Sequence, residues 1–373
     1  MGGCEAAPVE GHQAMTIAHI IGGADAGGAE RMVVNLLNAL ASMAPLLILT
    51  GRRGTGALLE HLDTRVTVLH VPCRLRRMPN DVMRLAAVLR ERRIQVVHSH
   101  MFGASLFAAL AARAARVPVF LTSEHGLNPW KRAWHRWIER YLISRYARAR
   151  ICVSQDIRKL RATSDGIPST QLKLIPNGTC VGDAGEDRMH AVPRLLAVGR
   201  LIEAKDYPTL IAAARLLREG GVVFELNIAG DGPLRASLER LSSSAGLDGH
   251  VRWLGSRRDV DSLMRTSDVF VMSSIREGQP MVLLEAMAAA RPIVATAVGG
   301  IPGTVSGERE ALLVPPRDPQ ALAAAVRRLL EDSELARRLG ANARRRAVQE
   351  FSIEAVARAH VDLYQTLLAG AKA

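Results

Sequence analysis

The chain has 373 residues, which exceeds one ordinary hydrophobic core and predicts two domains. No apolar stretch approaches the roughly 20 residues that cross a bilayer, so no transmembrane helix is expected. Aromatic residues make up only 4%, which disfavours a base-stacking surface for nucleic acid, and the four scattered cysteines indicate a reduced, cytoplasmic protein without a disulfide framework.

The positive charge is concentrated in the first half of the chain. Residues 1–190 hold 25 Lys and Arg against 15 Asp and Glu, a net charge of +10, whereas residues 191–373 hold 24 against 21, a net charge of +3. A basic half suits an anionic lipid surface or an acidic substrate. Arg74, Arg76 and Arg77, in a predicted turn, fit a lipid-pyrophosphate-linked or acidic glycan.

Strand-like apolar runs alternate with segments of helical period from end to end. Such alternation is typical of parallel sheets covered by helices, so the fold class is α/β with two doubly wound, Rossmann-like domains. The predicted strands are 17–21, 46–49, 66–71, 96–97, 117–121, 151–153, 195–198, 222–228, 251–254, 269–272, 293–295 and 312–314.

The composition changes at residues 183–192, which lack apolar periodicity and are predicted to link the domains. The N-terminal domain then covers residues 15–182 and the C-terminal domain residues 193–350. Residues 1–14 carry acids but no basic residue or apolar core, so we expect a disordered extension and not a signal peptide.

A glycine-rich turn follows the first strand, in Gly22-Gly-Ala-Asp-Ala-Gly-Gly-Ala-Glu-Arg31. The amides of Gly27 and Gly28, at the start of a helix, can face a phosphate. A tight turn without a ligand explains the glycines equally well. Their spacing is not that of a dinucleotide fingerprint, which disfavours a nicotinamide cofactor.

Three histidines follow strands of the N-terminal domain: His98, His100 and His125. We place His98 and His100 on opposite faces of an extended strand and find no accompanying Asp or Cys cluster, so no metal site is expected. His125 precedes a glycine at a strand end and is the better candidate for contacting substrate.

Residues 129–150 combine aromatic residues at helical spacing with many arginines. This pattern predicts a basic amphipathic helix that can lie on an anionic membrane. A helix packed against its own domain, with a solvated outer face, is the alternative.

Charged residues follow two strands of the C-terminal domain. Arg200 and Lys205 come after its first strand and can neutralise a diphosphate without a metal, although two surface cations are the simpler explanation. Glu277 and Glu285 lie between a later strand and its helix, where carboxylates can bind a vicinal diol or favour the helix dipole. The glycines of 229–233 are explained by a strand-to-helix turn.

Taken together, these motifs resemble the GT-B retaining glycosyltransferases of group 4. The resemblance covers nearly the whole chain from Met15. It is carried by Gly27-Gly-Ala-Glu-Arg31, Leu174-Ile-Pro-Asn-Gly178, Val198-Gly-Arg200 with Lys205-Asp206, Glu277-Gly with Leu284-Glu-Ala-Met-Ala288, and Val298-Gly-Gly-Ile-Pro302.

The resemblance implies transfer of a hexose from a UDP- or GDP-sugar to a glycan or lipid-linked acceptor, with retained configuration and without a metal or other cofactor. Glu285 would bind the ribose, Arg200 and Lys205 the diphosphate. Glu277 with the backbone of Gly278, Gln279, Pro280 and Met281 would bind the sugar and phosphates. Gly27 and Gly28 would close the site, His125 would contact the donor sugar, and a last helix within 351–373 would cross back to the first domain.

The chain departs from the family pattern at four positions: Met272, Ala290, Gly303 and Ala311. Family members commonly have Pro, Gly, Glu and Gly there, and the missing acid at Gly303 can alter contacts near the nucleotide. The alternatives to a transferase are a non-catalytic, membrane-associated partner with the same fold, or an epimerase or phosphorylase on a similar scaffold.

Overall fold

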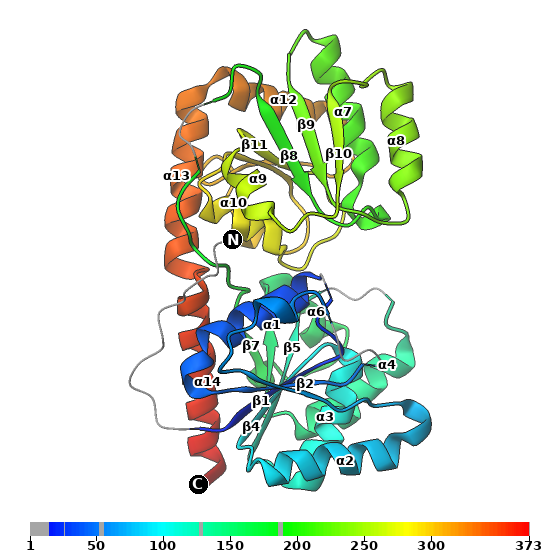
Figure 1. Cartoon of the computed structure of the whole chain (residues 1–373), viewed down its shortest axis with the longest axis vertical. Coiled ribbons are helices and arrows are strands. Elements are labelled where there is room, and N and C mark those ends of the chain that lie inside the picture. Colours follow the sequence, from blue (N-terminus) through cyan, green and yellow to red (C-terminus); the bar gives the residue numbers. More distant parts are fainter. Residues whose placement is uncertain (1–14, 26, 52–55, 127–129, 186–188, 373) are drawn as a thin grey trace. The chain divides into compact units, whose positions relative to one another are not determined.

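The computed structural model describes residues 15–25, 27–51, 56–126, 130–185 and 189–372. The chain forms two units, each built on its own parallel sheet (Figure 1). What we call the N-terminal unit includes the described residues up to Gly178 and those from Ser352 onward, and the C-terminal unit contains Thr179–Phe351. The expected extension 1–14 lies outside the described residues.

The N-terminal unit has a seven-stranded sheet in the order β3-β2-β1-β4-β5-β6-β7. The strands between the two edges are buried along their whole length, because helices cover both faces of the sheet, while edge strand β3 is mostly exposed. The strands are β1 (Ile17–Ile21), β2 (Leu46–Leu49), β3 (Thr67–His70), β4 (Val96–His100), β5 (Val119–Glu124), β6 (Ala149–Cys152) and β7 (Leu172–Leu174).

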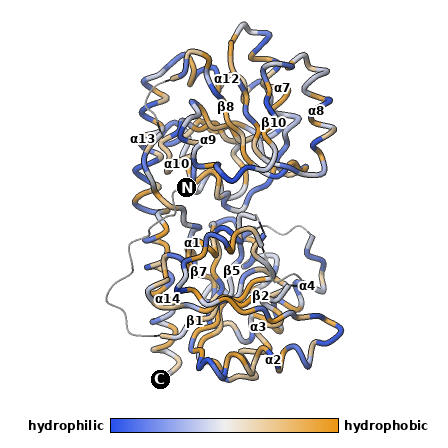
Figure 2. The backbone as a smooth tube through the Cα atoms, viewed as in Figure 1, coloured by the Kyte–Doolittle hydropathy of each residue, from blue (hydrophilic) through white to orange (hydrophobic). Residues whose placement is uncertain are grey.

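The helices of this unit pack their apolar sides on the sheet, whose inner strands are coloured as hydrophobic in Figure 2. They are α1 (Gly28–Ala39), α2 (Met78–Glu91), α3 (Phe102–Ala115), α4 (Ala133–Ile138), α5 (Ser144–Tyr146), α6 (Gln155–Thr163) and α14 (Ile353–Lys372). Ser154 caps α6 by accepting a hydrogen bond from the amide of Ile157.

The C-terminal unit has a six-stranded sheet in the order β10-β9-β8-β11-β12-β13. Its strands are β8 (Arg194–Val198), β9 (Glu225–Ala229), β10 (Val251–Gly255), β11 (Val269–Met272), β12 (Ile293–Thr296) and β13 (Leu312–Val314). Its helices are α7 (Tyr207–Glu219), α8 (Arg235–Ser244), α9 (Val260–Arg265), α10 (Met281–Ala288), α11 (Ile301–Thr304), α12 (Pro319–Glu331) and α13 (Ser333–Glu350).

Helix α14 belongs to the N-terminal unit although it ends the chain. It packs on α1 and β5, and the hydroxyl of Tyr364 lies 2.7 Å from Nδ1 of His98 on β4. The expectation of two doubly wound domains with a returning last helix is therefore confirmed. Among the described residues, no helix combines the length and apolarity that a membrane span requires.

The predicted basic amphipathic helix is interrupted. Helix α4 ends at Ile138, a π-helical turn covers Glu139–Ile143, and α5 follows with three residues. Trp130 precedes α4. The aromatic spacing predicted one continuous helix, whereas buried Glu139 accompanies a local change of helical geometry.

Each sheet has one point where the strand order reverses, between β1 and β4 in one unit and between β8 and β11 in the other. Ligands of open α/β sheets bind outside the carboxyl ends of the strands at such points. These two edges are therefore where functional side chains are to be sought.

Candidate active site

Beyond the carboxyl ends of β8 and β11, the C-terminal unit brings a lysine and a glutamate together. Nζ of Lys205 lies 2.6 Å from Oε1 of Glu277, and the hydroxyl of Ser274 donates to the same oxygen at 2.7 Å. The Ser273 hydroxyl donates to the backbone oxygen of Lys205 at 2.9 Å, which fixes the lysine segment against the end of β11. The pair is partly exposed, with side-chain exposures of 19% for Lys205 and 11% for Glu277, so a ligand can reach it.

Two glycines make the backbone approach possible at this edge. Gly299 has φ +51°, and a Cβ there would lie 1.9 Å from the backbone oxygen of Glu277. Gly230, with φ +147°, would place a Cβ 1.9 Å from the oxygen of Gly199. Any larger residue would push the strand-to-helix turns apart. The close approach of the backbone thus explains the glycine at 230, in line with the expectation that the turn at 229–233 accounts for its glycines.

Glu285 lies in α10, the helix that follows Glu277 after one turn-rich connection. Its side chain is buried, as are Gln279 and Met281 at the start of the helix. Gln279 donates from Nε2 to the hydroxyl of Thr304 at 3.3 Å. Burial makes a carboxylate an effective acceptor for a ligand's hydroxyl groups, because competing water is excluded.

Arg200 lies two residues after the end of β8 and is exposed. Among the described residues we find no side-chain hydrogen bond or ion pair for Arg200, so its guanidinium is available to a ligand. The structure therefore brings Lys205 to Glu277 and leaves Arg200 at the surface of the same strand end. Ser274 and Tyr207 were missed by the sequence analysis. The Tyr207 hydroxyl donates to Gly199 at 3.0 Å, and burial raises its pKa.

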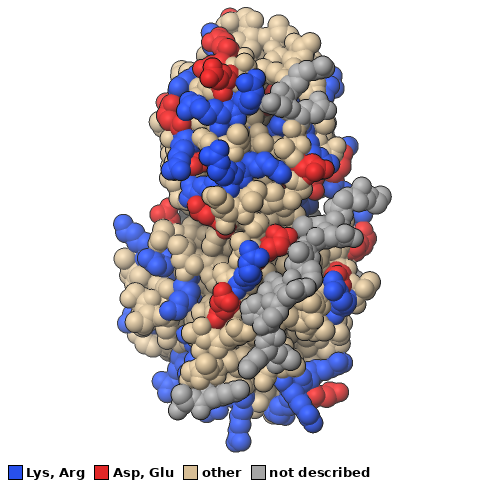
Figure 3. All heavy atoms as spheres, turned by 90° about the vertical axis from the view of Figure 1, so that its left-hand side faces the viewer, with Lys and Arg blue, Asp and Glu red and all other residues tan. Residues whose placement is uncertain are grey.

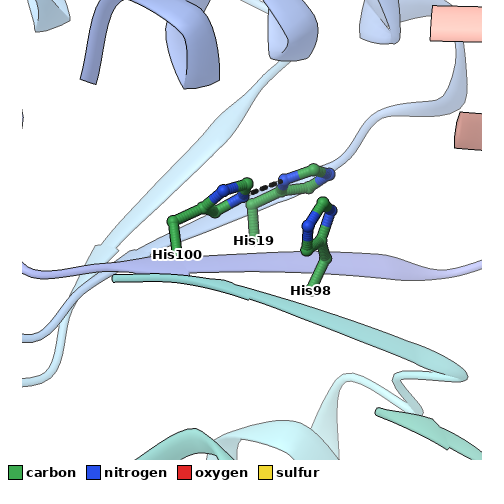
Figure 4. Close-up of side chains that lie close together, drawn as sticks. All are labelled: His19, His98 and His100. Carbon is green, nitrogen blue, oxygen red and sulfur yellow. Dashed lines mark hydrogen bonds between the residues drawn. The ribbon is translucent and has the colours of Figure 1, made fainter. Parts of the chain in front are cut away.

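In the N-terminal unit, the strand-order reversal is occupied by histidines. His19 on β1 pairs in register with His98 on β4, and His100 lies two residues further along β4. The ring centroids of His98 and His100 are 4.2 Å apart. The expectation that His98 and His100 point to opposite faces was wrong, because side chains two residues apart in a strand share a face. Figure 4 shows the three rings gathered above the sheet.

His125, directly after β5, is joined to this group. Its Nε2 lies 3.1 Å from Nδ1 of His100, and its Nδ1 lies 3.3 Å from Oδ1 of Asn177. His100 in turn places Nε2 3.0 Å from Nδ1 of His19. Both ring nitrogens of His125 thus have protein partners, so its ring is held in place and is not a freely available base.

His19, His98 and His100 are buried and His125 is partly buried, and desolvation lowers the pKa of all four rings, that of His19 to about 3. They are neutral at physiological pH, which is the form that binds metals. Nitrogens of His19, His98 and His100 lie within 4.8 Å of one another. Two ligands of one zinc ion lie only about 3.4 Å apart, and His98 already contacts Tyr364 and Ser123 at 2.7 Å each. Hydrogen bonding accounts for the cluster better than a metal does.

Gly27 and Gly28 lie where expected, at the start of α1 after the turn that follows β1. Gly27 is the residue before the first helical turn and has no side chain to cap it. A Cβ at Gly27 would lie 2.1 Å from Oε2 of Glu30. The Gly27 amide donates to the backbone oxygen of Asp25 at 2.8 Å and the Glu30 carboxylate lies beside Gly27, so a phosphate at this helix start would have to take the place of these partners.

A cavity of about 730 Å³ lies elsewhere in the C-terminal unit. Asp268 and Pro292 line it, and these residues precede β11 and β12, so the cavity lies at the edge opposite to Glu277. Arg337, Arg344 and Arg345 of α13 also line it, and basic side chains gather on the face that carries α13 (Figure 3). It is separate from the candidate active site.

The aromatic residues of the predicted amphipathic helix form an exposed surface, which we call the tryptophan surface. Its members are between 52% and 60% exposed: Trp130, Trp134, Trp137 and Tyr141. Arg132, Arg136 and Arg140 are exposed beside them. Beneath this surface lies a buried ion cluster, in which Lys131 contacts Glu124 and Glu139, and Arg150 contacts the same two acids.

Two units, each built on an open, doubly wound parallel sheet, are characteristic of the GT-B class of proteins. Residues 26–181 match the family model described as Glycosyltransferase Family 4, and residues 188–346 match that described as Glycosyl transferases group 1. The putative glycosyltransferase EpsF of Bacillus subtilis is 32% identical over 300 residues, covering 74% of this chain and 78% of EpsF. The chain belongs to this glycosyltransferase family.

Two further proteins resemble the chain over most of its length. A UDP-Gal:alpha-D-GlcNAc-diphosphoundecaprenol alpha-1,3-galactosyltransferase of Escherichia coli is 26% identical over 326 residues, covering 80% of this chain and 84% of that enzyme. The crystal structure of Anabaena HepE in complex with UDP superposes with a TM-score of 0.83 at 21% identity, covering 94% of this chain and all of the other. The second similarity shows the GT-B fold.

Proposed function

We propose that the protein is a retaining, metal-independent hexosyltransferase. It takes a hexose from a UDP- or GDP-sugar and transfers it to a glycan or a lipid-linked acceptor in bacterial polysaccharide or cell-envelope synthesis. The observation that carries this proposal is the Lys205–Glu277 pair, held by Ser274 at the strand-order reversal of the C-terminal unit.

The donor's diphosphate is assigned to Lys205 and Arg200. A lysine 2.6 Å from a carboxylate is already oriented, and its remaining protons are free to bond phosphate oxygens. Arg200 supplies a second, exposed cation at the same strand end. Fixed positive charge stabilises a departing diphosphate without a metal, and this is the largest contribution we assign to catalysis.

The sugar and ribose are assigned to the acids. Glu277 with the backbone from Gly278 to Met281 binds the hexose and its phosphates, and buried Glu285 accepts hydrogen bonds from the ribose hydroxyls. From the N-terminal unit we assign Gly27 and Gly28 to the phosphates and His125 to the hexose. In this scheme the leaving phosphate oxygen receives the acceptor's proton on the face from which it departs, so the anomeric configuration is retained.

The relatives support the ligand classes. The Escherichia coli enzyme is named for a UDP-galactose donor, a diphosphoundecaprenol-linked acceptor and an alpha linkage in its product. The HepE structures hold UDP, and one of them holds UDP-glucose. A lipid-diphosphate acceptor also suits the basic N-terminal half of the chain.

The proposal is tested by incubating the protein with UDP- and GDP-hexoses and undecaprenyl-diphosphate-linked sugars, with EDTA present. We expect transfer to one acceptor, and NMR of the product should show the anomeric configuration of the donor. Loss of transfer in EDTA with recovery in Mg²⁺ would refute metal independence. An inverted product would refute retention, and no nucleotide release with any donor would favour the non-catalytic partner. Epimerised or phosphorolysed sugar would identify the remaining alternatives.

A peripheral position on the cytoplasmic face of the membrane is part of this proposal. The exposed tryptophans beside exposed arginines favour it, because indole rings prefer the membrane interface and arginines attract anionic lipid. We expect flotation with vesicles containing phosphatidylglycerol but not with neutral vesicles, and loss of flotation in Trp134→Ala/Trp137→Ala. Equal behaviour with both vesicle types would favour the domain-packing alternative.

A further inference from the structure

Three histidines of the N-terminal unit, the buried His19 and His100 and the partly buried His125, form a series of hydrogen bonds that has a direction. Asn177 presents Oδ1, which only accepts, so the proton of His125 lies on Nδ1. Nε2 of a neutral His125 is then an acceptor, and Nδ1 of His100 donates to it. The Nε2 atom of His100 accepts in its turn from Nδ1 of His19.

The number of N–H protons equals the number of hydrogen bonds. Three neutral imidazole rings carry three N–H protons, and the three contacts, of 3.0, 3.1 and 3.3 Å, need one proton each. Every proton therefore points toward Asn177, and each ring adopts the Nδ1–H tautomer. The Nε2 atom of His19 is left as a buried lone pair, and no described residue forms a hydrogen bond with it.

The three hydrogen-bonded histidines follow one another in the order of the strands that carry them. His19 comes from β1, His100 from β4 and His125 from the end of β5, so the contacts run across three adjacent strands toward the ligand-binding edge. The dashed line of Figure 4 marks the link between His19 and His100. A ring held at both nitrogens fixes the backbone at the end of β5 more firmly than burial alone.

We propose that His19 and His100 are positioning residues which hold the ring of His125 neutral, protonated on Nδ1, and fixed in orientation at the carboxyl end of β5. They do so without contacting substrate. The importance of this for catalysis rests on the proposed transferase function, in which His125 contacts the donor sugar. The tautomers themselves do not depend on that function.

The first test is NMR of the whole protein with ¹⁵N-labelled histidine, which reports the proton position in each ring. We expect His19, His100 and His125 each to show a protonated Nδ1 and a bare Nε2. A protonated Nε2 in any of the three would overturn the proposal. Stoichiometric binding of added Zn²⁺ with loss of the Nδ1 protons would overturn it in favour of a metal site.

The second test separates the two links of His100. The amide nitrogen of Asn lies near the position of Nδ1 and the amide oxygen of Gln near that of Nε2, so His100→Asn can still donate to His125, whereas His100→Gln can only accept from His19. We expect His100→Asn to keep the tautomer of His125 and nearly normal kcat. We expect His100→Gln to lose that tautomer signature. Its kcat should fall about tenfold, because one oriented hydrogen bond contributes about 1.4 kcal/mol, and its KM for the donor should change less.

His360→Gln is the matched control. His360 is buried beside His98, but its Nδ1 bonds only to the backbone of Val356 in its own helix. We expect it to leave the tautomer of His125 and kcat unchanged. Equal kcat losses in His100→Asn, His100→Gln and His360→Gln would overturn positioning in favour of general packing. Loss of the tautomer signature with unchanged kcat would refute a catalytic role for the hydrogen-bonded histidines. If neither the wild type nor any variant transfers sugar, the proposed function fails while the NMR result stands.

Discussion

The two strand-order reversals of this protein are built from opposite kinds of polar chemistry. In the N-terminal unit, neutral histidines lie in the interior and satisfy one another. In the C-terminal unit, a charged lysine and glutamate lie at the partly exposed edge. One topology can thus serve either for rigid positioning, where charge is excluded, or for binding an anion, where charge must remain accessible.

The largest effect is expected from the charges that the N-terminal unit does bury. Lys131→Met leaves Glu124 and Glu139 without one of their cations, and an uncompensated buried charge costs about 3–5 kcal/mol of unfolding free energy. Urea denaturation measures it. Lys159→Met is the control, because Lys159 is exposed on α6. A loss below 1 kcal/mol would mean that the remaining cations, Arg150 and Arg161, suffice to hold the two acids.

A slightly smaller effect is expected at the accessible pair of the C-terminal unit. Lys205→Ala removes the cation assigned to the diphosphate, and we expect kcat for transfer to fall about 10²–10³-fold with little change in thermal stability. Glu285→Ala should abolish transfer by removing the ribose contact. Lys173→Ala, at an exposed lysine of the other unit, serves as the control. Wild-type rates in Lys205→Ala and Glu285→Ala would contradict the site assignment.

The smallest effect per residue is the loss of stability when the pH is lowered. Burial lowers the pKa of His19 from 6.5 to about 3 and that of His360 to about 4. Their contribution to stability is complete above pH 6.5 and is lost as pH falls, because the unfolded chain binds protons first. Each of these two histidines should lower the free energy of unfolding by roughly 2 kcal/mol at pH 5.

Urea titrations at pH 7 and pH 5 measure this loss. Glu139 acts in the other direction, because burial and the neighbouring Glu124 raise its pKa. His360→Phe should lose less stability than the wild type between the two pH values. An identical loss in both proteins would show that His360 is not buried in neutral form.

Local sequence predicted most elements of the fold because their signals are local. Apolar runs located the strands, and Asp318 and Asp332, which cap α12 and α13, show the same kind of short-range determination. The tryptophan segment was predicted less well. Its aromatic spacing favours a continuous helix, but buried Glu139 lies in a π-helical turn between α4 and α5.

The candidate site divides in the same way. The acids, the lysine and the glycines could be chosen from the sequence, because residues after parallel strands gather at one edge of a sheet. Ser274 carried only a weak signal, three residues before Glu277. No feature of the sequence indicated the role of His19, since a lone histidine in an apolar strand does not reveal its neighbours on the adjacent strand.

Local sequence accounts for most of the strand and helix pattern, for the two-domain α/β class and for which residues follow most strand ends, because these depend on contacts between near neighbours along the polypeptide. Long-range contacts alone reveal that Lys205 meets Glu277, 72 residues away, and that His19 meets His100, 81 residues away. The physical reason is that strand order and register, which no local pattern contains, select the side chains that share one edge or one face of a sheet.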